Sequence, residues 1–312
     1  MSVFLEALAA IGVMLVISRI YSLLSFIWLY ARPSTVCKFL HGPTPAYALI
    51  TGASDGIGKA VALELYDRGF NIILHGRNEE KVRKVAHALR ARAGETRDVR
   101  YFIADAGEAG HNFAKLIEPF KELNITLVIH NVGGMALKRE RIDERSESEL
   151  MGIIQLNALF SLMLTRILLP QLRFAAKHGP VLVQFTGSLG GEIGPPRTAI
   201  YAASKAFLKG LTRALDNDER AWKPTGVRFA YAAVGQVVGS TMNSKVEVSA
   251  MAPSADRMGA WYVDRLGCGR RVYYPYLLHA FQFADALVGE AATDILVART
   301  MKYLVTLEEK NT

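Results

Sequence analysis

Apolar and polar positions divide the chain into an apolar N-terminal stretch and a longer region where short apolar runs alternate with amphipathic ones. Residues 3–30 are apolar except for Glu6, Arg19 and a few serines. Because about 20 apolar residues suffice to cross a bilayer, this stretch predicts a membrane anchor. Arg19 would either reach the interface from the end of a span over residues 7–24 or belong to helices lying partly in the interface. The alternative is a buried N-terminal helix.

Charges near the apolar stretch indicate its orientation. Glu6 stands where a cleaved signal peptide carries basic residues, which argues against cleavage. Arg32 and Lys38 follow the stretch, so the rest of the chain is expected to face the cytosol. We therefore divide the chain into an anchor with its linker, residues 1–42, and a folded domain, residues 43–312.

The second region alternates strand-like and helix-like runs. Strands are expected at residues 47–50, 99–104, 126–134, 181–188 and 226–234, with a further strand ending near His75. Helices are expected at residues 57–68, 79–93, 113–123, 147–172 and from 199 to about 223. Such alternation predicts an α/β fold with a doubly wound parallel sheet, which binds ligands at the carboxyl ends of its strands.

A glycine-rich turn joins the first strand to the first helix of this region. Gly52, Gly56 and Gly58 permit a close approach that a Cβ would forbid, leaving helix N–H groups free to face a pyrophosphate. Glycines in such turns also serve packing alone. The turn therefore predicts, without proving, a dinucleotide site.

The end of the second strand decides between the nicotinamide cofactors. No carboxylate stands at His75, Gly76 and Arg77, and the guanidinium of Arg77 favours the 2′-phosphate of NADP, to which His75 could add a weak contact. The alternative is that Arg77 is an ordinary surface residue. Three further candidates follow other strands, where each could also cap a helix: Asp105, Asn131 and Gly133.

The candidate catalytic groups lie between residues 188 and 205. Tyr201 and Lys205 are four residues apart in a helical pattern and share one face, where the ammonium should lower the phenol pKa. Ser188 ends the preceding strand, and its hydroxyl could bond a substrate oxygen beside the phenol. The alternative is that Tyr201 is only a packed ring and Lys205 only a solvated amine, with no catalytic role.

Two other regions leave alternatives open. Asn157, inside an almost wholly apolar helix, either bonds locally or holds a water near Lys205. Residues 240–278 lack clean periodicity and suit a loop over the substrate. The apolar helical tail after Pro275 forms core helices, a pocket wall or a bilayer contact, so we expect residues 240–312 to cover the substrate.

Composition excludes several classes of protein. The 312 residues suffice for one large α/β domain. The net charge is +8, but the lysines and arginines are scattered along the chain and mixed with acidic residues. We therefore expect no nucleic-acid surface. Cys37 and Cys268 show no metal-ligand spacing, so reduced thiols are the default and no metal site is predicted.

The motifs TGASDGIG and HNVGG, followed by Asn157, Ser188, Tyr201 and Lys205 in this order, resemble the short-chain dehydrogenase/reductase superfamily over about residues 47–303. The anchor and the segments GFNIILHGRN and YPYLLHAFQF are similar to the membrane-bound very-long-chain 3-oxoacyl-CoA reductase and type 12 17β-hydroxysteroid dehydrogenase group. The resemblance implies a Rossmann fold and NADP(H) as cofactor. It implies cofactor contacts from Gly52, Ser54, Asp55, Gly56, Ile57, Gly58, Arg77, Asp105, Asn131, Gly133, Tyr201, Lys205 and Val237.

The same resemblance implies the catalytic roles. Tyr201 would donate a proton to a ketone oxygen that Ser188 steadies, while NADPH delivers hydride to the carbon. Lys205 would bond the nicotinamide ribose, and Asn157 would hold a water for reprotonation. The expected activity is reduction of 3-oxoacyl-CoA in fatty-acid elongation at the endoplasmic reticulum membrane, with a homodimer or other elongation enzymes as possible partners.

Departures from the family pattern keep an alternative open. His130 and Val132 replace the usual residues of the family's N-N-A-G motif, and Val234 stands where a proline is usual. The C-terminus lacks the dilysine signal common in reticulum-resident members. A reductase of a steroid, terpenoid or polyketide ketone in specialised metabolism is therefore the second hypothesis.

Overall fold

The computed structural model describes residues 2–92, 97–239, 246–281 and 289–309. The chain divides into two compact units, Met1–Ser34 and Thr35–Thr312. The short 3₁₀ turn η1 (Val36–Phe39) belongs to the second unit, where Lys38 Nζ donates a hydrogen bond to the Gly267 carbonyl at 2.6 Å. The expected functional division after residue 42 stays a prediction.

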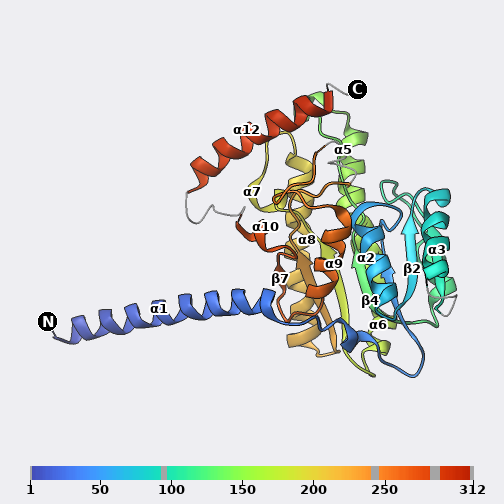
Figure 1. Cartoon of the computed structure of the whole chain (residues 1–312), viewed down its shortest axis with the longest axis horizontal. Helices are drawn as coiled ribbons and strands as arrows, with labels where there is room; N and C mark the ends of the chain where they lie inside the picture. Colours follow the sequence, from blue (N-terminus) through green and yellow to red (C-terminus); the bar gives the residue numbers. More distant parts are fainter. Residues whose placement is uncertain (1, 93–96, 240–245, 282–288, 310–312) are drawn as a thin grey trace. The chain divides into compact units, whose positions relative to one another are not determined.

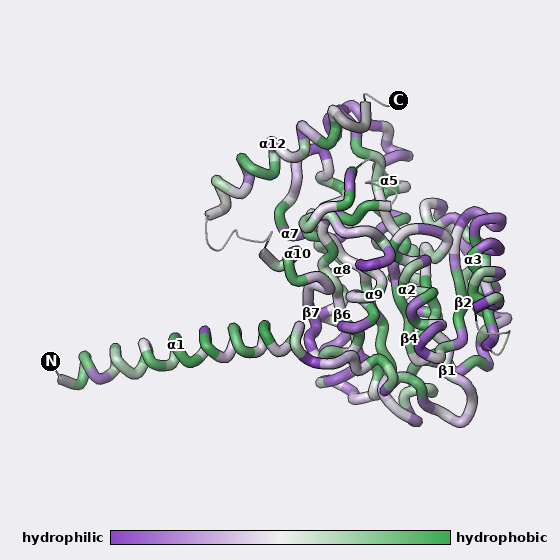
Figure 2. The backbone as a smooth tube through the Cα atoms, viewed as in Figure 1, coloured by the Kyte–Doolittle hydropathy of each residue, from purple (hydrophilic) through white to green (hydrophobic). Residues whose placement is uncertain are grey.

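The first unit is a single helix, α1 (Ser2–Ala31), of 30 residues. At 1.5 Å per residue it is about 45 Å long, more than the ~30 Å hydrocarbon core of a bilayer. Figure 2 shows hydrophobic residues along most of its length. Its stretch Val3–Ala31 is long and apolar enough to cross a membrane. Helix α1 is therefore a candidate membrane anchor.

The second unit is built on one seven-stranded sheet in the order β3-β2-β1-β4-β5-β6-β7. All neighbouring strands are parallel, as predicted. Ile50, at the end of β1, pairs with Leu74 of β2 and Ile129 of β4, so the strand order reverses at β1. Ligands of doubly wound sheets bind beside such a reversal. The strands are β1 (Ala46–Ile50), β2 (Asn71–Gly76), β3 (Val99–Ile103), β4 (Asn124–His130), β5 (Val181–Thr186), β6 (Val227–Ala232) and β7 (Val272–Tyr273).

Helices cover both faces of the sheet (Figure 1). On one face, Ile117, Phe160 and Leu208 of three helices share a hydrophobic core with strand residues such as Val128 and Val183. These three helices are α4 (Phe113–Ile117), α6 (Phe160–Ala175) and α8 (Ala199–Asn217). Because β1, β2, β4 and β5 are buried at every position, a second layer must cover the other face. We assign to it α2 (Gly56–Asp67), α3 (Glu79–Arg92) and α9 (Ala255–Arg265), of which α2 packs against both β1 and α9.

Local chemistry shortens or interrupts several expected helices. The helix expected at 113–123 ends at Ile117, and a 3₁₀ turn, η2 (Glu118–Phe120), follows at Pro119. The helix expected at 147–172 is α5 (Glu147–Ile154) and α6, joined by one π-helical turn, η4 (Gln155–Leu159). The remaining short elements are η3 (Ile142–Glu144), α7 (Gly190–Ile193) and η5 (Asp218–Trp222).

The prediction of a loop over residues 240–278 is wrong for α9. Met258 and Tyr262 of this helix are buried, and a Cβ at Gly259 would lie 2.5 Å from Ala60 Cβ of α2. Glycine thus permits close helix packing, which one-dimensional periodicity does not reveal. Helices α10 (Leu277–Phe281) and α12 (Glu290–Glu309) follow. Residues 240–245 and 282–288 of the expected substrate-covering segment lie outside the described residues.

Candidate active site

Tyr201 and Lys205 lie one turn apart on α8, at the carboxyl end of β5. Both are buried, with 9% and 3% of their surface exposed. Lys205 Nζ lies 5.7 Å from the centre of the Tyr201 ring and donates a hydrogen bond to the Thr186 carbonyl at 3.1 Å. The pair is therefore held against the last residue of β5, as its helical spacing predicts.

The loop after β5 places Ser188 beside Tyr201. The backbone N–H of Ser188 donates to the Tyr231 hydroxyl at 3.2 Å, and Ser188 Oγ accepts from the Gly190 N–H at 3.0 Å. A Cβ at Gly190 would lie 3.3 Å from Ser188 Oγ and 3.5 Å from Tyr201 Cε1. Because the hydroxyl oxygen accepts from the backbone, its hydrogen is left to point to the phenol or a substrate oxygen.

Burial dominates the electrostatics of this pair. It raises the pKa of Tyr201, and a hydrogen bond with Ser188 opposes this rise. Burial also lowers the pKa of Lys205 to about 8. The expected net lowering of the phenol pKa is therefore wrong, because burial has the largest effect and raises it. The phenol is in its protonated, acid form at neutral pH.

Asn157 lies in the π-helical turn η4, completely buried. Its Nδ2 donates to the carbonyls of Ile153 and Gly134, each at 2.9 Å, and its Oδ1 accepts from the Gly134 N–H at 2.9 Å. The side chain thus fastens this helix to the loop after β4. A π turn shifts side-chain direction within a helix and is frequent at functional sites. Asn157 thus makes the expected local bond, to Ile153, and also bonds the distant Gly134, and the water stays a prediction.

Gly133 brings Asn157 and Lys205 to one point. A Cβ at Gly133 would lie 2.7 Å from Asn157 Oδ1 and 2.9 Å from Lys205 Nζ. Only a residue without a side chain fits there, which gives a physical reason for the glycine in HNVGG.

The glycine-rich turn packs tightly on the same loop after β4. Gly52 and Gly56 have φ of 65° and 53°, in the left-handed region that glycine favours. A Cβ at Gly58 would clash with the Gly52 carbonyl oxygen and lie 2.5 Å from Asn131 Nδ2, which itself donates to that oxygen at 3.3 Å. A side chain at Gly52 or Gly58 would therefore collide with the protein's own atoms, so this tight cradle requires glycine.

Asp55, Ser54 and Ile57 surround the start of α2. Asp55 is the N-cap and accepts from the Gly56 N–H at 2.8 Å, while its other oxygen pairs with Lys81 at 3.2 Å. Ser54 Oγ lies beside Gly76, at the end of β2. Ser54 and Ile57 are half-buried. All three thus line the entry to α2.

His75 does not reach outward, so it makes no contact of the kind considered for it with a phosphate. Its ring is buried, its Nδ1 accepts from the Gly52 N–H at 3.3 Å, and its Nε2 bonds the Ala104 carbonyl at 3.1 Å. Burial lowers its pKa to about 4, so the ring is neutral and can accept that N–H. His75 therefore fixes the glycine-rich turn through its hydrogen bond with the Gly52 N–H.

Arg77 and Asp105 come together at the ends of β2 and β3. Arg77 Nη1 lies 3.8 Å from Asp105 Oδ2, and 75% of the arginine side chain is exposed. This weak, solvent-screened contact leaves the guanidinium able to turn toward an incoming anion. Val237 is buried in the turn after β6. The ligand contacts of all three remain predictions.

Sequence reasoning missed residues that position the site without carrying its chemistry. Thr51 Oγ1 accepts from the backbone N–H groups of Asn131 and Val132 at 3.0 and 3.1 Å, joining the loops after β1 and β4. Its place just before the glycine-rich turn was a usable signal. Tyr231 and His279, which bond Ser188 and Gly235, gave none, because their partners are distant in sequence.

The candidate residues therefore gather at the carboxyl edge of the sheet in four local groups. These are Gly52 with Gly58 and Asn131; Gly133 with Asn157 and Lys205; Ser188 with Tyr201; and Arg77 with Asp105. A protonated phenol beside a hydroxyl and an ammonium can supply a proton to an oxygen atom and stabilise the charge left behind.

The chain is similar in sequence to known proteins. Residues 46–250 match the family model described as short chain dehydrogenase. A very-long-chain 3-oxoacyl-CoA reductase of Kluyveromyces lactis is 34% identical over 246 residues, covering 75% of this chain and 69% of that protein. One of Pyricularia oryzae is 28% identical over 279 residues, covering 88% of this chain and 82% of the relative.

Solved structures agree with the fold. A short-chain dehydrogenase from Sphingobium yanoikuyae in complex with NADPH aligns with a TM-score of 0.64 at 22% identity, covering 79% of this chain and 94% of that one. A short chain dehydrogenase from Shigella flexneri complexed with NADP aligns with a TM-score of 0.65 at 26% identity, covering 76% and 99%. The chain belongs to the short-chain dehydrogenase family of oxidoreductases.

Proposed function

We propose that this protein reduces the 3-keto group of hydrophobic 3-oxoacyl-CoA substrates with NADPH. The observation that carries the proposal is the placement of Ser188 beside Tyr201, with Lys205 Nζ 5.7 Å from the centre of the Tyr201 ring, at the carboxyl edge of the sheet. The names of the relatives from Kluyveromyces lactis and Pyricularia oryzae support the substrate class.

The residues present fit a nicotinamide dinucleotide phosphate. The cradle of Gly52, Gly56 and Gly58 would hold the pyrophosphate against the start of α2, and Arg77 would meet the 2′-phosphate. Asp105 would accept from the adenine amine. Asn131, Gly133 and Val237 would line the rest of the site. When bound, NADPH supplies the hydride.

The chain's own residues manage the proton. Tyr201 donates its phenolic proton to the ketone oxygen as the carbonyl carbon receives hydride, which yields the alcohol. The Ser188 hydroxyl donates a hydrogen bond to the same oxygen and so fixes its position. The Lys205 ammonium stabilises the phenolate that remains, and Asn157 keeps the neighbouring loop in place. Such acid catalysis typically contributes about 10²- to 10⁴-fold to the rate.

An apolar surface beside the phenol suits a hydrophobic substrate. Met135, Ile153 and Tyr201 form a separate buried cluster, against which Leu137 and Ile200 pack. An acyl chain lying against the half-buried Leu137 and Ile200 would remove apolar area from water at about 25 cal/mol per Å². A ring ketone would satisfy the same surface, so it remains the second candidate function.

Charge should separate the two substrate classes. Arg141 is exposed on the loop that follows Met135, whereas Lys138 is already paired with Glu149 at 3.1 Å. Arg141→Ala should raise the KM for a long-chain 3-oxoacyl-CoA several-fold more than the KM for an uncharged steroid ketone. The matched control is Lys84→Ala on α3, which should change neither value. Equal effects of Arg141→Ala on both substrates would contradict the acyl-CoA assignment.

The same proposal places the protein in the endoplasmic reticulum membrane, anchored by α1 with residues 43–312 facing the cytosol. The apolar length of α1 supports the anchor. Removing residues 1–34 should release the protein from microsomes without abolishing reductase activity in detergent. Protease added outside sealed microsomes should digest the catalytic domain, and its protection would contradict the orientation.

A further inference from the structure

His279 of α10 is a buried histidine with no part in the proton chemistry described above. None of its surface is exposed, and its Nδ1 accepts a hydrogen bond from the Gly235 N–H at 2.9 Å. Gly235 opens the turn of residues 235–239 that follows β6. Val237, an expected cofactor contact, lies in the middle of this turn. A short helix near the C-terminus is thus bonded directly to an edge of the cofactor site.

The same turn is also held from the start of α9. The Val238 N–H donates to the Pro253 carbonyl at 2.9 Å, and the Ala255 N–H donates to the Val238 carbonyl at 3.0 Å. The backbone of the turn therefore has two supports, α10 through an imidazole and α9 through backbone bonds. A displacement of the turn must strain one or both.

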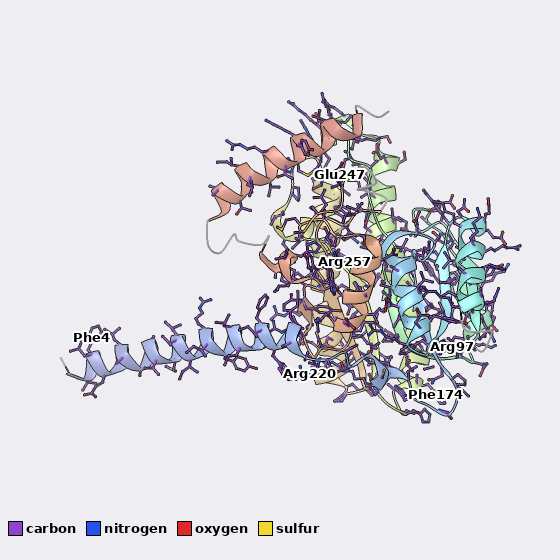
Figure 3. The ribbon with its side chains drawn as sticks, viewed as in Figure 1. Phe4, Arg97, Phe174, Arg220, Glu247 and Arg257 are labelled. Carbon is purple, nitrogen blue, oxygen red and sulfur yellow. The ribbon has the colours of Figure 1, made fainter. Side chains whose placement is uncertain are left out.

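Aromatic contacts also connect His279 to α9. The Tyr276 ring lies edge-on to His279 at 5.1 Å and parallel to Trp261 of α9 at 4.2 Å. The Tyr276 hydroxyl donates to the Ala250 carbonyl at 2.8 Å, and Arg257 covers the other ring, with 5.7 Å between its guanidinium carbon and the Trp261 centre. Figure 3 labels Arg257 on α9. The imidazole is thereby oriented by packing, so its nitrogen stays aimed at Gly235.

We propose that His279 is a positioning residue that clasps the C-terminal segment to the cofactor-binding turn, so that binding of NADP(H) and the placement of α10 are coupled. This inference rests on the proposed use of NADP(H). On this proposal, α10 fixes the position of the turn of residues 235–239. The fluorescence of Trp261 should report changes at His279, because the indole stacks on Tyr276, whose ring contacts His279.

The ring is suited to this task because it is neutral. Burial lowers the pKa of His279 to about 4, so Nδ1 keeps the lone pair that accepts the N–H throughout the physiological range. Asparagine offers an oxygen at the same distance from its Cα as Nδ1, whereas alanine offers none. His279→Asn and His279→Ala therefore test the hydrogen bond itself.

The experiment uses the full chain in detergent with one tryptophan. The protein has three tryptophans, so Trp28→Phe with Trp222→Phe leaves Trp261 alone. NADP⁺ binding is measured by calorimetry, and Trp261 emission is recorded at saturating NADP⁺. We expect His279→Ala to weaken NADP⁺ binding about 10-fold, in line with one unpaired N–H, and to abolish the emission change. His279→Asn should restore both, and His87→Ala, on the surface of α3, should alter neither.

A second variant tests the aromatic contacts of His279 without removing the imidazole. Tyr276→Leu keeps the imidazole but removes the ring that orients it, so it should reduce the Trp261 response and weaken NADP⁺ binding by about 3-fold, less than His279→Ala does. An unchanged affinity and an unchanged Trp261 response in His279→Ala would overturn the clasp alone. Failure of the parent protein to bind NADP⁺ would overturn the proposed cofactor and the clasp together.

Discussion

Gly133→Ala is the substitution that most severely tests the geometry of the site. The added Cβ would lie 2.7 Å from Asn157 Oδ1 and 2.9 Å from Lys205 Nζ, where ordinary contacts begin near 3.4 Å. The amide and the ammonium must each retreat by about 0.5–0.7 Å, because neither can interpenetrate a carbon atom. Asn157 is held by three hydrogen bonds, so the loop or Lys205 must yield.

The displacement should affect activity more than stability. Overpacking of this kind costs about 1–3 kcal/mol of folding free energy. A misplacement approaching 1 Å in a catalytic constellation costs about 10²-fold in rate, so kcat should fall by about 10- to 100-fold. NADPH affinity should also weaken, because Gly133 lies where the cofactor is expected.

The assay is steady-state NADPH oxidation together with thermal unfolding. Gly210→Ala is the matched control, because this glycine is exposed on α8 and a Cβ added to it would meet nothing within 4 Å. It should stabilise the helix by about 0.5–1 kcal/mol and leave kcat unchanged. If Gly133→Ala had the kcat of the parent protein, the close approach of Asn157 and Lys205 would not matter for catalysis.

Further predictions concern three other residues of the site, Arg77, His75 and Lys205. Arg77→Ala should raise the KM for NADPH at least about 10-fold and leave that for NADH nearly unchanged, whereas equal effects would remove Arg77 from the 2′-phosphate site. His75→Ala frees the Gly52 N–H and should cost about 1–3 kcal/mol in unfolding experiments, and a smaller cost in His75→Asn would confirm the acceptor role. Because Lys205 loses its charge near pH 8, kcat should fall as pH rises through about 8. The unfolded state binds the lysine proton more tightly, so the parent should gain stability relative to Lys205→Met between about pH 8 and 10.5, as chemical denaturation can show.

Patterns that depend on neighbouring residues predicted the fold well. Apolar runs such as Val181–Thr186 are buried on both faces and form strands of a parallel sheet, as their alternation with helices requires. The spacing of Tyr201 and Lys205 placed both on one buried helix face. These features follow from helical and strand periodicity, which the sequence carries locally.

Features that depend on tertiary packing could not be predicted. A weak phosphate contact was considered for His75, but Phe160 stacks on its ring, which is buried. Helix α9 escaped detection because Gly259 and aromatic residues mask its periodicity, yet that glycine allows contact with Ala60. The pKa of Tyr201 depends on burial that sequence spacing does not report.

The most direct test compares the parent protein with Tyr201→Phe, using NADPH and a long-chain 3-oxoacyl-CoA in detergent, with NADH as the control cofactor. The account predicts that the parent consumes NADPH and forms the 3-hydroxyacyl-CoA. It also predicts that Tyr201→Phe loses at least about 10²-fold in kcat and still binds NADPH, because only the proton donor is missing. Turnover by Tyr201→Phe at the rate of the parent protein would contradict the assignment of the phenol as the acid.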